Sequence, residues 1–325
     1  ELIIELAEAL KDYRKDEGLN PTTSNISSWI SQFSSENQQV VLQEMIHIFN
    51  CRYLTEEEVE TFLTDLITNK QLAGINYQEY WNNVSLLKIQ KDGNSQNVMV
   101  EKFKAIIQDK IDITVSINDN SKKKFIYVDD FLFTGGRLRN DLAEWFKVAP
   151  QDARLDIIYV GYFKSAKYYL ETNWIKNNNI KNIDIHFWNL VELENKTNCQ
   201  STSHVLFPIE DVIEEEESIK NYLALQPGYK LRDKNQKVGY KCESSIFSSE
   251  QNRQILEKEF TIAGLKINEK LHDPKKKIYW KPLGISQFNG LGFGGLVFSY
   301  RNCPNNTPLA LWWGDWNNNQ VWYPL

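Results

Sequence analysis

The middle of the chain alternates short apolar runs with stretches of helical periodicity. The apolar runs that predict strands cover residues 84–89, 111–117, 125–133, 155–162 and 183–188. Helices are predicted between them, over residues 96–108, 138–148 and 164–176. Strands that alternate with helices favour a parallel sheet with right-handed crossovers, so the predicted fold class is α/β with a parallel sheet flanked by helices.

The first 82 residues have a helical pattern throughout. Leu2, Leu6 and Leu10 recur at helical spacing, and Trp29, Ile30 and Phe33 form a second apolar stripe. Two residue pairs at capping-box spacing predict further helix starts: Ser35 with Gln38, and Thr55 with Glu58. This region contains no recognisable chemistry and is interpreted as a helical appendage or docking surface.

The last third of the chain is aromatic and rich in glycine. Ser248 and Gln251 predict the start of a helix, and dense glycines over residues 290–295 predict close backbone approach or positive φ angles. Phe293, Trp312 and Trp313 either cover a core or form a stacking wall for a base. The predicted division is therefore a helical region at 1–82, a core at 83–208 and an aromatic α+β covering region at 209–325.

Composition limits the classes of function. The chain has 325 residues and a net charge of −6, which gives no electrostatic basis for nonspecific nucleic-acid or membrane binding. No apolar run of about 18 residues is present, so no membrane span is expected. The four cysteines are widely spaced without a Cys-x-x-Cys pair, and no signal peptide is recognised, which favours a reducing cytoplasm.

The central strand carries the candidate chemistry. Its apolar residues lead to Asp129 and Asp130, and after three further apolar residues comes the turn Thr134-Gly135-Gly136. Strand ends of open α/β sheets bind ligands, and backbone N–H groups at a helix start favour a phosphate. Two carboxylates beside such a turn suit a sugar phosphate, with the diol on the acids and the phosphate on the amides.

Two further segments are candidates for phosphate contact. The polar turn at residues 91–95 follows the first strand, and Lys91 and Gly93 in it suit a diphosphate, although such a sequence is also an ordinary surface turn. The basic run Lys122 to Lys124 lies in a short loop, where it either reaches a phosphate or forms a solvated face.

The segment from Phe125 to Gly136 resembles the ribose-phosphate motif of the type I phosphoribosyltransferases. The resemblance implies that Asp129 and Asp130 bind the ribose hydroxyls of phosphoribosyl pyrophosphate, and that residues 134–136 bind its 5′ phosphate. It further implies that the loop at Lys91 and Gly93 holds the diphosphate, and that Mg²⁺ bridges the diphosphate and ribose oxygens near the acid pair. Two positions depart from the family pattern. Phe133 removes one candidate base, and Arg137 either adds a cation for the phosphate or crowds the pocket.

The combination of regions resembles, more narrowly, the phosphoribosyltransferase-like proteins of bacterial conflict systems. These are encoded with partners that include large ATPases, and some act as effectors of anti-phage retron modules. The resemblance implies a cytoplasmic effector that acts on a nucleotide, or on a nucleic acid as acceptor, with a protein partner and without a membrane.

Three functional classes stay open from the sequence. The first is an active transferase or hydrolase at ribose C1′, in which negative carboxylates stabilise an oxocarbenium-like centre. The second is a degraded enzyme that binds a nucleotide and regulates a partner, which Phe133, Arg137 and the short loop at residues 118–124 favour. The third is an interaction scaffold. His186 and His204 are candidate bases, but structural roles are favoured for both.

Overall fold

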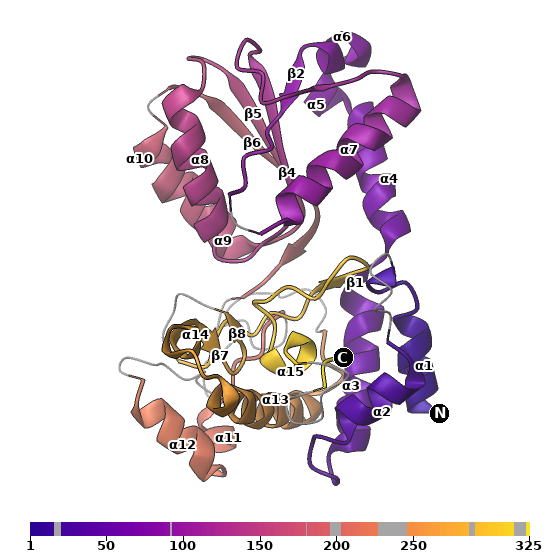
Figure 1. Cartoon of the computed structure of the whole chain (residues 1–325), viewed down its shortest axis with the longest axis vertical. Coiled ribbons are helices and arrows are strands. Elements are labelled where there is room, and N and C mark those ends of the chain that lie inside the picture. The colour runs from indigo at the N-terminus through magenta and orange to yellow at the C-terminus, as the bar shows by residue number, and fades with distance from the viewer. Residues whose placement is uncertain are drawn as a thin grey trace. The chain divides into compact units, whose positions relative to one another are not determined.

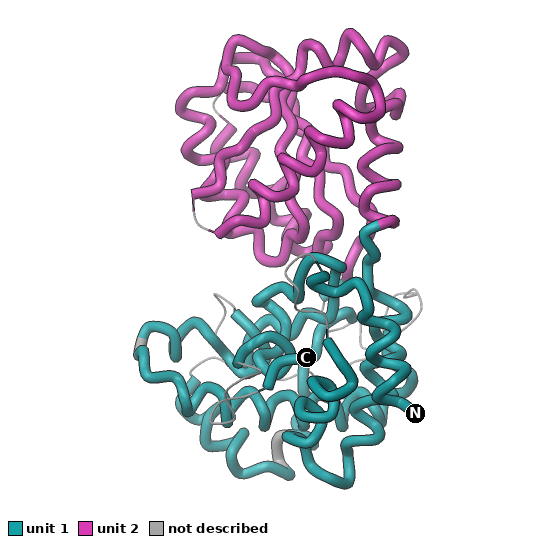
Figure 2. Tube along the Cα trace, turned by 45° about the vertical axis from the view of Figure 1, so that its right-hand side comes forward, with its two compact units in different colours: residues 1–56, 194–325 teal, residues 57–193 magenta. Residues whose placement is uncertain are grey.

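The chain folds into two compact units, which are described separately here. The computed structural model describes residues 1–15, 21–91, 93–179, 181–195, 203–226, 246–285, 290–314 and 323–325. Unit 1 comprises residues 1–56 and 194–325, and unit 2 comprises residues 57–193 (Figure 2). Unit 1 thus joins the start of the chain to its C-terminal region. The division into three consecutive regions, at 1–82, 83–208 and 209–325, stays a prediction from the sequence.

Unit 2 is built on a five-stranded sheet. Its strands are β2 (Val84–Leu86), β3 (Ser116–Ile117), β4 (Lys124–Leu132), β5 (Arg154–Phe163) and β6 (Asp184–Leu193), in the order β3-β2-β4-β5-β6. Every pairing is parallel, with Phe125 opposite Leu155 and Leu155 opposite Ile185. The prediction of a parallel sheet flanked by helices is therefore confirmed.

One predicted strand is much shorter than expected. The apolar run at residues 111–117 contributes only β3, because the preceding helix α7 (Ser95–Ile111) continues into it. Asp112 ends that helix in the left-handed region, with φ 53°. The apolar residues that remain are then too few to form more than a two-residue edge strand.

Helices cover both faces of the sheet in unit 2. Helix α8 (Gly136–Val148) and α9 (Lys164–Tyr169) lie on one face, and α7 and α4 (Glu56–Ile67) lie on the other (Figure 1). The helix predicted over residues 164–176 consists of α9, a π-helical segment (Leu170–Ile175) and α10 (Lys176–Asn178). Two short helices, α5 (Lys70–Ala73) and α6 (Tyr77–Asn82), precede β2.

Helix α8 packs on the sheet through buried side chains. Phe125 of β4 meets Trp145 of α8 edge to face, with ring centroids 5.0 Å apart. Tyr127, Ile157 and Leu142 belong to the same buried cluster. Burial of each such side chain contributes about 1.5–3 kcal/mol. Leu132 at the end of β4 and Leu138 in the first turn of α8 belong to this cluster too, so core residues flank the turn that joins the two elements.

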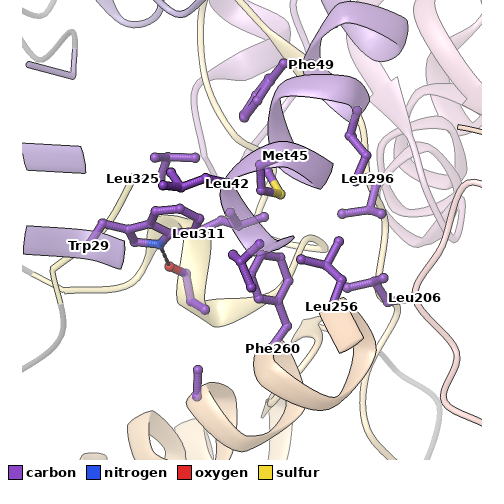
Figure 3. Packing of buried hydrophobic residues seen from close by; sticks show 14 of the residues in the cluster. Trp29, Leu42, Met45, Phe49, Leu206, Leu256, Phe260, Leu296, Leu311 and Leu325 are labelled. Atoms are coloured by element: carbon purple, nitrogen blue, oxygen red, sulfur yellow. Dashed lines mark hydrogen bonds between the residues drawn. The ribbon is translucent and has the colours of Figure 1, made fainter. Parts of the chain in front are cut away.

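Unit 1 has a core formed by segments that are distant in the sequence. Figure 3 shows Trp29 of α2 (Thr23–Ile30) and Phe260 of α13 (Glu250–Lys270) in this core, with the Trp29 indole donating to the carbonyl of Ala310 at 2.8 Å. The other helices are α1 (Leu2–Ala9), α3 (Gln38–Arg52), α11 (Glu210–Glu214), α12 (Glu217–Ala224), α14 (Pro274–Tyr279) and α15 (Leu309–Trp312). Two small sheets pair β1 (Tyr53–Leu54) with β9 (Phe298–Ser299), and β7 (Trp280–Lys281) with β8 (Gly284–Ile285).

Two predicted helix caps are wrong. Helix α3 begins at Gln38 after Asn37, so Ser35 does not cap it. Helix α13 is capped by Ser249, whose hydroxyl accepts from the N–H of Asn252 at 3.1 Å. Ser248 instead binds Glu44, a buried carboxylate that accepts its N–H at 2.8 Å and its hydroxyl. A buried carboxyl group needs hydrogen-bond partners. Ser248 therefore pairs with Glu44 and does not cap the helix, although the local sequence fits a capping box. Helix α4 does begin directly after Thr55.

The glycine-rich segment of unit 1 is confirmed as a place of close backbone approach. Gly292 and Gly294 have φ of 115° and 72°, and a Cβ at Gly294 would lie 2.3 Å from the carbonyl oxygen of Leu206. Phe293 is buried, and Trp312 and Trp313 pack partly buried against the core. Their described contacts are those of core residues. Among the described residues, no helix combines the length and apolar composition needed to cross a bilayer.

Candidate functional site

The strand order of unit 2 reverses between β2 and β4. From β2 the chain continues through α7 to β3 on one side, and from β4 it continues through α8 to β5 on the other. In open α/β sheets, ligands bind outside the carboxyl ends of the strands at such a reversal. The segments that follow β2 and β4 therefore form the candidate site.

The two acids lie near the end of β4 and differ in their surroundings. Asp129 is 3% exposed, whereas Asp130 is only partly buried. One oxygen of Asp129 accepts the N–H of Asp130 at 2.9 Å. Burial, followed by the negative charge of Asp130, raises the pKa of Asp129 well above its usual value. The pair is thus chemically unequal.

The turn after β4 forms the start of α8. Gly135 has φ 74° and occupies the N-cap position, and the Thr134 hydroxyl accepts the N–H of Gly136 at 3.4 Å. The positive φ favours glycine here, and a Cβ on Gly135 would crowd the side chain of Leu170 at 3.1 Å. The first-turn N–H groups of a helix point away from its body and carry positive partial charge. The turn is therefore suited to a phosphate.

The segment after β2 lies against this turn. A Cβ on Gly93 would be 3.6 Å from the Arg137 guanidinium, which places the two predicted phosphate segments side by side. Lys91 lies 3.6 Å from Glu144 of α8, and both side chains are exposed, so this ion pair contributes little stability. Asp92 of the predicted loop lies outside the described residues.

A buried polar chain next to the acids was missed by sequence reasoning. The Tyr127 hydroxyl donates to Asp141 of α8 at 2.9 Å, and the Tyr127 ring lies beside that of Tyr159 on β5, with centroids 6.1 Å apart. Burial, and then the charge of Asp129, raise the pKa of Tyr159 well above its usual value. A signal exists in the sequence, because Asp141 falls on the apolar stripe of its helix with Leu138 and Leu142.

Comparison with known families agrees with this geometry. The chain matches the model of the PRTase-CE family over residues 26–325, which is nearly its whole length. The chain belongs to the PRTase-CE family. It is therefore a member of a phosphoribosyltransferase-like family, as the motif in β4 predicts. Comparisons with curated proteins and with solved structures found no match.

Phe133 has a packing role in this PRTase-CE protein. Its side chain is buried, with ring centroids 5.2 Å from Phe163 and 6.2 Å from Phe131. Gly161 makes room for this cluster, since a Cβ there would lie 2.9 Å from the Phe131 ring. Phe133 is therefore part of the hydrophobic core, and its side chain offers no base.

Several other candidates lie away from the site. The Lys122 and Lys123 ammonium groups donate to the carbonyls of Asn82 and Gln151, which precede β2 and β5 and so lie at the amino ends of the strands. His186 pairs with Asp184 at the start of β6, at 2.8 Å. His204 belongs to unit 1, where its Nδ1 accepts the N–H of Glu194 at 2.8 Å. Within unit 2, neither these lysines nor His186 joins the acids.

The donor set near the acids suits an ion shared with a substrate. The described residues contain no group of three or more His, Cys, Asp or Glu side chains able to hold a metal by themselves. One or two carboxylates together with substrate phosphates are a common magnesium environment. Asp129 and Asp130 fit that arrangement as partners of an ion bound chiefly by a diphosphate.

Proposed function

We propose that the carboxyl ends of β2 and β4 bind phosphoribosyl pyrophosphate or a related nucleotide. The observation that carries the proposal is the acid pair and the Thr-Gly-Gly turn within one strand-turn-helix segment, at the reversal of strand order. The 5′ phosphate would lie on the amides of Thr134, Gly135 and Gly136, with the ribose diol on the acids. The diphosphate would lie toward Gly93 and Arg137, whose proximity supports one continuous anion site. Lys91 would add positive charge at its edge.

The chemistry we propose is substitution at ribose C1′. The bond from C1′ to the diphosphate oxygen breaks, and its electron pair leaves with pyrophosphate. The acceptor then forms the new bond; when water is the acceptor, ribose 5-phosphate and a proton are released. Carboxylates near C1′ stabilise the positive charge that develops on the sugar. Magnesium would arrive with the substrate and neutralise the leaving diphosphate.

A second candidate function is a nucleotide-binding sensor without turnover. The observation that favours it is Phe133, because its side chain packs with Phe163 and leaves no base at this position. A good nucleophile as acceptor needs little help from a base, so the transferase stays the first proposal.

One experiment distinguishes the two candidates. Purified protein is incubated with phosphoribosyl pyrophosphate and Mg²⁺, with and without candidate nucleobases, and pyrophosphate release is measured. Release that is lost in Asp129→Asn/Asp130→Asn supports the enzyme. Binding without release supports the sensor, and neither binding nor release by the wild type would overturn both.

The proposed cellular context rests on the sequence resemblance alone. A cytoplasmic anti-phage effector with an ATPase or retron partner would co-purify with the products of neighbouring genes. Recovery of the chain without any such partner from its native cells would contradict this part of the proposal.

A further inference from the structure

A buried hydrogen bond joins β4 to α8 across the candidate site. The Tyr127 hydroxyl of β4 donates to the Asp141 carboxyl group of α8 at 2.9 Å, and the two residues are 0% and 7% exposed. They lie 14 positions apart in the sequence. The acids at residues 129–130 and the phosphate turn at residues 134–136 both lie between them. The bond therefore closes the segment that carries both groups.

This bond is more specific than the apolar packing around it. The rings of Phe125 and Trp145 join the same two elements, with centroids 5.0 Å apart. The burial of apolar surface is non-directional, so such packing tolerates small shifts of a helix. A hydrogen bond is favourable only over a narrow range of distance and angle. The Tyr127–Asp141 bond therefore restricts where α8 lies along β4.

Both ends of the bond lie close to a proposed ligand-binding group. Tyr127 precedes Asp129 by two positions on β4, so the two side chains share one face of the sheet. Asp141 lies in the second turn of α8, directly after the first turn that begins at Gly136. Residues 133–135 alone connect the strand to the helix. A shift of α8 would therefore change the separation between the acids and the amides of the phosphate turn.

We infer that the Tyr127–Asp141 hydrogen bond sets the separation between the acids and the phosphate turn, so that the site selects a sugar that carries a diol and a phosphate at one fixed spacing. The inference deepens the proposed function and rests on it for the identity of the ligand. Tyr127 and Asp141 are positioning residues in this account, since they act through the acids and the turn. A ligand that carries only the phosphate does not depend on the spacing.

The test compares a ligand that needs both groups with one that needs the turn alone. Ribose 5-phosphate carries a diol and a phosphate, whereas inorganic phosphate carries no diol. Both are titrated into the isotope-labelled whole chain, and dissociation constants are taken from the amide NMR signals of Gly135 and Gly136. Tyr127→Phe keeps the buried ring and removes the donor. It should bind ribose 5-phosphate about tenfold more weakly, the scale of one hydrogen bond, and inorganic phosphate within about twofold of the wild type.

Tyr80→Phe is the matched control. The Tyr80 hydroxyl of α6 donates to the buried Asp156 of β5 at 3.2 Å, in the same unit but near the amino ends of the strands. The control removes the same kind of bond, so it should lower stability and leave both dissociation constants unchanged.

Variants of Asp141 test whether the bond itself is responsible. Asp141→Asn keeps an acceptor oxygen for Tyr127 and should bind ribose 5-phosphate more tightly than Asp141→Ala does. The double variant Tyr127→Phe/Asp141→Ala should bind no more weakly than Asp141→Ala, because the same bond is absent from both. Full multiplication of the two effects would overturn the inference.

A ligand-free comparison addresses the spacing directly. The amide signals of Gly135 and Gly136 should move in Tyr127→Phe and stay in place in Tyr80→Phe, because only the first bond spans the turn. If neither ligand moves these signals in the wild type, the proposed function fails, and unmoved signals in ligand-free Tyr127→Phe would overturn the inference as well. If the wild type binds, the inference alone is overturned by wild-type affinity for ribose 5-phosphate in Tyr127→Phe, by an equal loss for both ligands, or by the same loss in Tyr80→Phe.

Discussion

Replacement of Gly135 by alanine tests why the turn after β4 has its present form. Gly135 has φ 74°, and its hypothetical Cβ would lie 3.1 Å from one methyl group of Leu170 and 3.4 Å from the other. A left-handed conformation costs an L-residue about 1–2 kcal/mol. Crowding against a buried side chain costs a further 1–3 kcal/mol or so. We therefore expect unit 2 to lose about 2–5 kcal/mol in Gly135→Ala.

The two contributions are separated by a second variant. Leu170 is fully buried, and Leu170→Ala alone should cost about 2–5 kcal/mol. In Gly135→Ala/Leu170→Ala the crowding is relieved, so the double variant should be about 1–3 kcal/mol more stable than the sum of the single variants. The part of the Gly135→Ala loss that remains is backbone strain.

The assay is native-state hydrogen exchange of peptides from β4 and β5, which reports the free energy of opening of unit 2 by itself. Gly74→Ala is the control for strain outside the site: Gly74 also has φ 74°, but a Cβ there would have no neighbour within 4 Å. It should lower stability without changing ligand binding. Wild-type stability in Gly135→Ala, or strict additivity with Leu170→Ala, would refute the reasoning.

Three further predictions follow from individual side chains. Phe133→Ala should destabilise unit 2 by about 3–5 kcal/mol, because the ring is buried against Phe163. The control Tyr168→Ala, at an exposed position, should change stability by less than about 0.5 kcal/mol. Equal effects of the two substitutions in urea unfolding would contradict this prediction. Asp129 has a raised pKa from burial and from Asp130, so the folded chain holds its proton more tightly than the unfolded chain. Its contribution to stability is present at low pH and is lost as pH rises through the raised pKa. Asp129→Asn should remove that loss. If urea unfolding of Asp129→Asn gave a stability profile against pH parallel to that of the wild type, this prediction would be contradicted. Burial raises the pKa of Cys303 to about 12, so iodoacetamide at mildly alkaline pH should label the exposed Cys51 and leave Cys303 unlabelled in peptide mass spectra.

Much of unit 2 could be predicted from the sequence because its central strands are strongly patterned. The apolar runs at residues 125–133 and 155–162 correspond closely to β4 and β5, and the Thr-Gly-Gly turn does start α8. Gly135 shows why: a left-handed N-cap at which a Cβ would crowd the buried Leu170 side chain favours glycine. Local patterns predict well where backbone geometry leaves few alternatives.

The remaining features depend on contacts between distant residues. The bond between the Tyr80 hydroxyl of α6 and Asp156 of β5 joins residues that lie 76 positions apart in the sequence. Ser248 fits a capping box but binds Glu44, which lies 204 positions away. The grouping of residues 1–56 with residues 194–325 likewise follows from packing of segments that the sequence separates. Such contacts are set by the folded chain as a whole.

The central claim is tested most directly by calorimetry of phosphoribosyl pyrophosphate with Mg²⁺, on the wild type and on Asp130→Asn. We expect binding in about the micromolar range by the wild type. In Asp130→Asn we expect a loss of about a hundredfold, because one of the two acids proposed to bind the ribose diol is replaced. No binding by the wild type, or equal binding by the two proteins, would contradict the account.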